Sequence, residues 1–275
     1  FRRMNFPRIL KKRKGYIDRI KPFMQKSVVK VLTGQRRVGK SFLLYQLIEE
    51  ILAEEPNANI IYVNLEDFTF SSLQTAEDLH SYIISHSKEK VKNYIFIDEI
   101  QDIPGFEKVI RSLLLNEDND IYITGSNAKM LSGELATYLS GRYIEFKIYS
   151  LSYSEFLEFH GLTESETSYE LYSRYGGLPY LLNLPLEDET VNEYLKSVYS
   201  TIVFRDVVSR YKLRNTLFLE KLIQFLSENI GNLFSAKNIS DYLKSQYTTI
   251  SVNQIQSYTA VSYTHLRAHE TRRHL

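Results

Sequence analysis

A glycine-rich octet that ends at residue 41 carries the clearest chemical signal in the sequence. It reads GQRRVGKS and fits the phosphate-binding pattern G-x-x-x-x-G-K-[ST]. Its backbone amides would surround a phosphate, Lys40 would reach the outer phosphates, and the Ser41 hydroxyl would hold Mg²⁺. The octet and the residue after it supply the candidate nucleotide-binding residues: Gly34, Gln35, Arg36, Arg37, Val38, Gly39, Lys40, Ser41 and Phe42.

The segments on either side of the octet fit this interpretation. An apolar, β-branched run over residues 28–33 predicts a buried strand, and apolar residues at helical spacing predict a helix over residues 40–54. The four fixed positions alone would occur by chance in roughly one chain of this length in a hundred. With a strand before it and a helix after it, a plain glycine turn with an exposed lysine is the weaker interpretation.

Two adjacent carboxylates follow a second apolar run. The sequence YIFIDE ends in Asp98 and Glu99, and one strand–helix unit separates it from the octet. On a strand beside a phosphate loop, the first carboxylate holds Mg²⁺ and the next polarises the attacking water. We therefore expect Ser41 and Asp98 as metal ligands and Glu99 as the catalytic carboxylate. Acidic residues commonly follow strands, so the octet upstream is what makes this pattern specific.

Two further positions are candidates for contact with the reacting phosphate. Ser126 and Asn127 follow an apolar run over residues 120–125, where they would sense the γ-phosphate, cap a helix, or do both. Arg142 precedes a predicted strand over residues 143–148, where it would act as an arginine finger in cis or in trans, or form a surface salt bridge. The candidate catalytic residues are Lys40, Glu99, Asn127 and Arg142.

The order of these segments predicts the fold class. Strands alternating with helices, with polar residues after the strands, indicate an α/β P-loop NTPase domain: a five-stranded parallel sheet flanked by helices. Beyond residue 150 the pattern becomes helical, with a helix–turn–helix rhythm typical of a winged-helix-like segment. The predicted parts are a basic segment (1–21), an ATP-binding domain (22–150), a helical lid region (151–212), a winged-helix-like segment (213–260) and a tail (261–275).

Composition restricts the class of protein further. The 275 residues include 43% hydrophobic residues, enough for one large or two ordinary domains. No apolar run approaches the length that spans a bilayer, and no apolar signal-peptide core follows the basic amino terminus, so we expect no membrane segment. Cysteine is absent, which excludes disulfides and thiolate metal sites and suits a reducing cytoplasm, the expected location.

The first 21 residues contain nine lysines and arginines against the single Asp18. Such a run either contacts nucleic acid or an acidic surface, or forms a solvated helix face. The winged-helix-like segment would likewise contact DNA or another protein. Its expected third helix offers amides, such as Asn253 and Gln254, and no cation.

The last 15 residues differ in character from the rest of the chain. VSYTHL at residues 261–266 resembles the translation of a transposon-end adapter used in sequencing libraries. We therefore exclude residues 261–275 from the fold. We expect the natural protein to continue beyond about residue 260.

Together, these motifs resemble the AAA-type ATPase domain of a large prokaryotic family. In that family a helical region, a winged-helix segment and a C-terminal domain of unknown function follow the ATPase domain, and we expect the last of these to be missing from this sequence. The resemblance is carried by KVLTGQRRVGKSFLL, YIFIDEIQDIPGFEKVIRSLL, IYITGSNAKML, LSGRYIEFKIYSLSYSEFL, YGGLPYLL and VFRDVVSRY.

The resemblance implies ATP with Mg²⁺ as ligands and an ATP hydrolase that works as a molecular switch or motor, with a homo-oligomer as one assembly open to it. It also implies that the phosphate-loop strand lies between the last strand and the strand before Ser126, and that Pro179 lies near the nucleotide. Two alternatives stay open: a weakly hydrolysing, nucleotide-gated module that holds DNA or a protein, and a small-molecule phosphotransferase.

Overall fold

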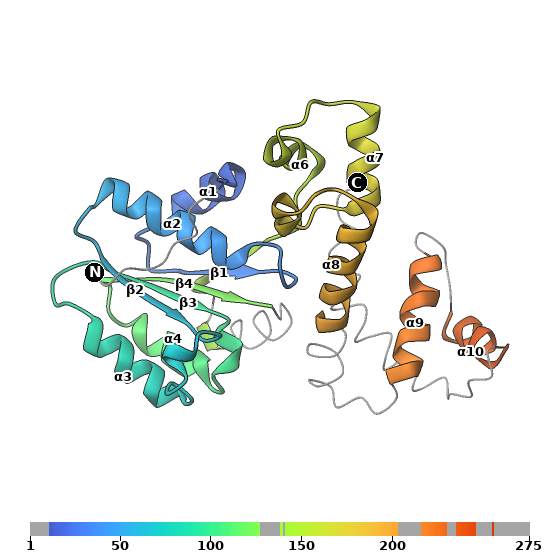
Figure 1. Ribbon diagram of the computed structural model, residues 1–275. Coiled ribbons are helices and arrows are strands. Elements are labelled where there is room, and N and C mark those ends of the chain that lie inside the picture. Colours follow the sequence, from blue (N-terminus) through green and yellow to red (C-terminus); the bar gives the residue numbers. More distant parts are fainter. Residues whose placement is uncertain are drawn as a thin grey trace. The chain divides into compact units, whose positions relative to one another are not determined.

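The computed structural model describes residues 11–126, 138–139, 141–202, 216–229, 235–245 and 255 (Figure 1). Asn127, nearly all of the expected third helix of the winged-helix-like segment, and the tail lie outside these ranges. The chain divides into two compact units, residues 1–186 and 187–275. No helix in the described ranges is long and apolar enough to cross a membrane.

A five-stranded parallel sheet forms the centre of the first unit. Its strands are β1 (Val29–Thr33), β2 (Asn59–Asn64), β3 (Asn93–Asp98), β4 (Asn119–Gly125) and β5 (Tyr143–Lys147). Their order is β2-β3-β4-β1-β5, with all neighbours parallel. The phosphate-loop strand β1 therefore lies between β4 and β5, which confirms the predicted fold class and strand order.

Helices cover both faces of this sheet (Figure 1). On one face lie α1 (Lys14–Ile20), the short η1 (Lys21–Phe23) and α2 (Lys40–Glu54), and on the other lie α3 (Ala76–His86) and α4 (Phe106–Leu113). Successive strand residues alternate between the two cores: in β3, Tyr94 and Phe96 pack with the α1–α2 layer, whereas Ile95 and Ile97 pack with α3 and α4. The alternation is the period of two that a strand imposes.

The described half of the basic amino-terminal segment belongs to this packing. Tyr16, Ile17 and Ile20 of α1 are buried in the same core as the apolar face of α2. Residues 14–20 are therefore a helix docked on the domain.

The chain after β5 is helical, as predicted. The first unit adds α6 (Tyr153–His160), α7 (Glu166–Tyr175) and η4 (Pro179–Asn183). The second unit contains α8 (Asp188–Thr201), α9 (Thr216–Glu228) and α10 (Ala236–Ser245). The boundary at residue 186 falls inside the range predicted as one helical lid region.

A fully buried ion pair joins β1 to β4 in the sheet. The Lys30 ammonium donates to Asp120 Oδ1, and it also donates to the Val28 carbonyl at 2.8 Å. The other carboxylate oxygen, Asp120 Oδ2, accepts from the Tyr122 hydroxyl and from the Gln25 N–H, each at 2.8 Å. Burial lowers the pKa of Lys30, and the Asp120 charge opposes that shift. The pair is tolerated in the interior because each charge has several partners.

We expect Asp120→Ala to lower the free energy of unfolding by about 3–5 kcal/mol, because it leaves the Lys30 charge buried without its counter-ion. Glu50→Ala is the matched control, since Glu50 pairs with Lys12 and Lys21 near the surface. It should cost about 1 kcal/mol or less in the same denaturant titration. Equal losses in the two variants would contradict this account of the pair.

Candidate nucleotide-binding site

The glycine-rich octet connects the end of β1 to the start of α2 at the carboxyl edge of the sheet. A Cβ added at Gly34 would lie 2.2 Å from the Ile148 carbonyl oxygen, so no side chain fits there. Gly39 has a φ of 93°, in the left-handed region that favours glycine. The backbone geometry therefore requires both glycines of the pattern.

Lys40 is folded back onto the loop. Its ammonium donates to the carbonyls of Gly34 at 3.0 Å and Gln35 at 3.1 Å, and lies 3.6 Å from Glu99 Oε1. Burial lowers the pKa of Lys40, while the charges of Glu99 and Asp98 act in the opposite direction. The ammonium thus stands at the loop with polar partners that the oxygens of a phosphate can replace.

Asp98 lies between the loop and β4 with a hydroxyl group on either side. Ser41 hydrogen-bonds to its carboxylate, and Thr124 donates to Oδ1. The carboxyl group is almost fully buried, which raises the pKa of Asp98, and the two hydroxyls counter that shift. A hydroxyl beside a carboxylate is the all-oxygen donor set that Mg²⁺ prefers, so the predicted pair of metal ligands fits the ion.

Glu99 has an unusual backbone conformation. Its φ is 56°, rare for a residue with a side chain, and its N–H donates to Thr124 Oγ1 at 3.0 Å. Burial alone would raise the pKa of Glu99, but the Lys40 charge and a hydrogen bond from Gln101 outweigh it and lower the pKa. Glu99 is therefore ionised at neutral pH, as an acceptor for a water proton must be.

Ser126 and Pro179 complete the described part of the site. The buried Ser126 hydroxyl lies close enough to Glu99 to help lower its pKa, yet it makes no well-formed hydrogen bond to any described residue. Such an orphaned hydroxyl fits a role as a ligand contact. The Pro179 ring approaches Gly39, with its Cγ 3.8 Å from the point where a Cβ would be.

The structure places Arg142 far from these residues along the sheet. Its carbonyl accepts from the N–H of Val29, at the start of β1, and β5 begins beside it. The Arg142 side chain is exposed at the amino edge, whereas the octet lies at the carboxyl edge. Arg142 is therefore not part of the cluster that this chain builds around its own phosphate loop.

Two arginines of the octet, and Phe42 directly after it, point in different directions. Arg36 pairs with Glu66, just past the end of β2, at 2.9 Å, and Arg37 is exposed with a φ of 65°. Phe42 is 46% exposed, with its ring against Tyr45 at a centroid distance of 6.1 Å. Sequence reasoning did not identify Thr124, although the strand that carries it was predicted.

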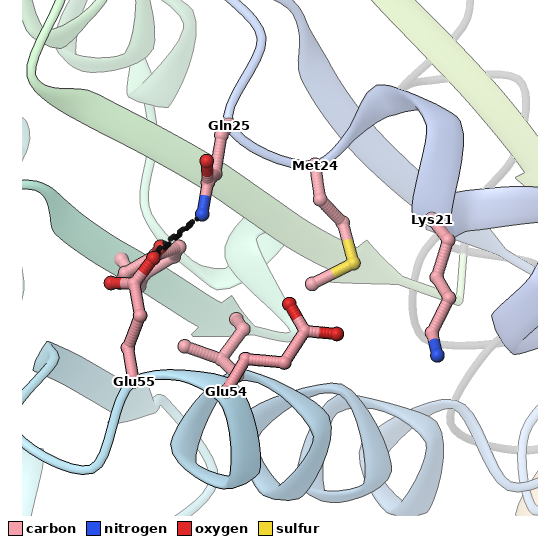
Figure 2. Close-up of a pocket in the computed structure, with 7 residues that line it drawn as sticks. Lys21, Met24, Gln25, Glu54 and Glu55 are labelled. Carbon is pink, nitrogen blue, oxygen red and sulfur yellow. Dashed lines mark hydrogen bonds between the residues drawn. The ribbon is translucent and has the colours of Figure 1, made fainter.

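A separate hollow of about 220 Å³ lies between η1 and the last turn of α2 (Figure 2). Gln25 donates to Glu55 across it at 2.8 Å. It is lined by Lys21, Met24, Gln25, Ile51, Glu54, Glu55 and Tyr94. Because Tyr94 is near the start of β3, this hollow is at the amino edge and shares no residue with the phosphate loop.

The strand order and the loop define a P-loop nucleotide-binding fold. Residues 26–157 match the family model of an AAA domain, and residues 166–261 match that of a domain of unknown function. The chain therefore contains an AAA domain followed by a further domain, which confirms the predicted AAA-type domain.

Two relatives share most of the chain. An uncharacterized protein of Haemophilus influenzae is 37% identical over 258 residues, which are 90% of this chain and 62% of that protein. An uncharacterized protein of Methanocaldococcus jannaschii is 32% identical, over 84% of this chain and 53% of that protein. The chain thus spans between half and two thirds of the length of these relatives.

Among solved structures, the ORC1 protein of Aeropyrum pernix in complex with DNA is similar at a TM-score of 0.45 and 14% identity. The alignment covers 93% of this chain and 84% of that one.

Thr124→Val should lower the free energy of unfolding by about 1–3 kcal/mol, because the buried N–H of Glu99 loses its acceptor and Asp98 loses a donor. The same change at Thr163, whose side chain is exposed, should cost less than about 0.5 kcal/mol. Chemical denaturation of the two variants checks this. A Thr124→Val chain as stable as the Thr163→Val chain would show that the hydroxyl does not support the carboxylates.

Proposed function

We propose that the chain binds ATP with Mg²⁺ and hydrolyses it, working as a molecular switch or motor. The observation that best supports this is the arrangement of Asp98 and Glu99. These consecutive carboxylates at the end of β3 contact two side chains of the phosphate loop. Ser41 hydrogen-bonds to Asp98, and the Lys40 ammonium lies 3.6 Å from Glu99 Oε1. The same edge of the sheet thus offers a metal-binding pair and, beside it, an ionised carboxylate.

Each residue has a proposed role in this reaction. Lys40 and the loop amides bind the β- and γ-phosphates, and Ser41 with Asp98 would hold Mg²⁺. The ion would neutralise charge on the phosphate oxygens. Glu99 accepts a hydrogen bond from the attacking water and orients it. Ser126, with Asn127 after it, is proposed as the contact to the γ-phosphate.

Two of the proposed roles depend on residues farther along the chain. Pro179 is proposed to pack beside the nucleotide, supported by its approach to Gly39. Arg142 is proposed to act in trans, in a homo-oligomer, because it stands at the opposite edge of the sheet from its own loop. There it would stabilise charge on the phosphoryl group bound by a neighbouring copy.

Binding of DNA through the basic amino-terminal segment finds less support. Lys12 and Lys21 both pair with Glu50, and Arg13 pairs with Glu155. In the second unit, α9 and α10 pack together through Leu222, Phe225, Leu226 and Ile239. That helix pair fits the predicted winged-helix-like segment and leaves the nature of a partner, DNA or protein, open.

Lys40→Ala should abolish ATP turnover and weaken ATP binding, because the loop loses its cation. Glu99→Gln should still bind ATP but hydrolyse it at least about a hundredfold more slowly, since the amide is no longer a base. Phosphate release measured without any added acceptor gives the turnover, and it also separates hydrolysis from phosphotransfer to a small molecule.

Glu54→Gln provides the matched control, because Glu54 is exposed in the last turn of α2. It should hydrolyse ATP at the wild-type rate. Wild-type turnover in Glu99→Gln would refute the assignment of Glu99.

A further inference from the structure

In the described part of the basic amino-terminal segment, residues 11–21, one arginine is buried. Arg13 is 4% exposed and lies just before α1, within the first unit. Its backbone N–H donates to the side chain of Gln46 on α2 at 2.9 Å, which fixes the start of α1. Its guanidinium packs over the ring of Tyr16, with Cζ 4.5 Å from the ring centroid. The charge run, for which we expected either a solvated helix face or a contact with nucleic acid or an acidic surface, thus places Arg13 inside the domain.

The guanidinium contacts the phosphate loop from outside. Its Nη1 donates to the Val38 carbonyl at 3.2 Å and to the Tyr149 carbonyl, in the segment after β5, at 2.8 Å. A trans peptide places a carbonyl oxygen and the next N–H on opposite sides. Holding the Val38 oxygen on the Arg13 side therefore turns the Gly39 N–H away from Arg13. In loops of this pattern the backbone N–H groups bind phosphate.

The other side of the guanidinium forms a bidentate pair with α6. Nε and Nη2 donate to the two carboxylate oxygens of Glu155, each at 2.9 Å. Burial alone would raise the pKa of Glu155, but the hydrogen bonds from Arg13 and from the Ser152 N–H outweigh it and lower the pKa. The carboxylate is therefore charged at neutral pH, and the pair is charge-assisted.

Glu155 also takes part in the N-terminal cap of α6. Its N–H bonds to the Ser152 hydroxyl, and its Oε2 accepts from the Ser152 N–H at 2.9 Å, which together form a capping box. One carboxylate thus serves both the cap of α6 and the arginine that holds the loop. A change in the position of the Val38 carbonyl would be transmitted to α6 through the Arg13 side chain and its ion pair with Glu155.

We propose that Arg13 is a positioning residue that orients the Val38–Gly39 peptide of the phosphate loop for phosphate binding and links that orientation to α6 through Glu155. The inference rests on the proposed binding of ATP. It adds a connection between the nucleotide and the helices that follow the sheet. Lysine could not replace Arg13 in this role, because only the planar fork of arginine serves a carboxylate and backbone carbonyls at once.

Arg13→Lys tests the first half of the proposal. The variant keeps the charge but loses the fork, so it should bind a non-hydrolysable ATP analogue with Mg²⁺ at least about tenfold more weakly. Arg19→Lys is the matched control, since Arg19 is exposed on α1 and undergoes the same chemical change. Its affinity should stay within about twofold of wild type. Titration calorimetry gives the affinities, and thermal unfolding checks that each variant is folded.

Glu155→Gln tests the second half. Glutamine preserves a capping side chain but removes the charge that holds Arg13. Hydrogen exchange of the peptide spanning α6 should slow on nucleotide binding in the wild type and in Glu158→Gln, an exposed control one turn away. That nucleotide-dependent slowing should be lost in Glu155→Gln. A role limited to stability would leave the nucleotide-dependent difference intact.

A folded Arg13→Lys variant with wild-type affinity would overturn the proposal. So would an α6 that responds to nucleotide equally in Glu155→Gln and Glu158→Gln, or that does not respond in the wild type. Should Arg13→Lys fail to fold, the exchange comparison decides alone. A wild-type chain that binds no nucleotide would refute the proposed function itself, a result distinct from all of these.

Discussion

Asp98 is almost fully buried, and the hydroxyls of Ser41 and Thr124 both hydrogen-bond to its carboxylate. The first hydroxyl comes from the phosphate loop and the second from β4, so this carboxylate joins three separate segments of the chain. Thr124 also accepts the N–H of Glu99, whose left-handed backbone needs such an anchor. The positions of both carboxylates therefore depend on one hydroxyl of a neighbouring strand, and that dependence requires the parallel pairing of β3 with β4.

The phosphate loop is constrained from both sides in a complementary way. Inside the domain, Gly34 is pressed against the carbonyl of Ile148, which leaves room for no side chain. Outside, Arg13 holds the carbonyl of Val38. The segment after β5 takes part in both contacts, because Tyr149 also accepts from Arg13. Further along, the N–H of Leu151 donates to the carbonyl of Gly177, two residues before Pro179. The segment after β5, which leads into α6, thus contacts the phosphate loop at Gly34 and is linked to it through the hydrogen bonds of Arg13.

The sequence was sufficient to predict the parts of the site that depend on local order. The octet, the Asp98–Glu99 pair and Ser126 each lie at the carboxyl end of a predicted strand. Parallel strands bring their carboxyl ends together at one edge of the sheet. The position of Arg142 at the amino edge of the sheet could have been predicted by the same rule. It precedes its strand rather than following it, and so falls at the amino edge. Asn127 stays a prediction, because it lies outside the described residues.

Long-range side-chain contacts could not be predicted in this way. Arg13 and Glu155 are 142 positions apart, and nothing in the basic run distinguishes the buried Arg13 from exposed described residues such as Lys14 and Arg19. Thr124 gave no signal either, because a threonine in a buried strand is usually only a strand former. Such residues are identified only when the packing of α1, α6 and the sheet is known.

The most direct test of the central claim is the magnesium dependence of nucleotide binding in the wild type and in Asp98→Asn, measured with a non-hydrolysable ATP analogue. If Asp98 and Ser41 form the metal-binding pair of an ATP site, Mg²⁺ will tighten binding to the wild-type chain. The same ion will have little effect on Asp98→Asn, because an uncharged amide is a poor ligand for Mg²⁺. Equal enhancement by Mg²⁺ in both chains, or no binding to the wild type at all, would contradict the account.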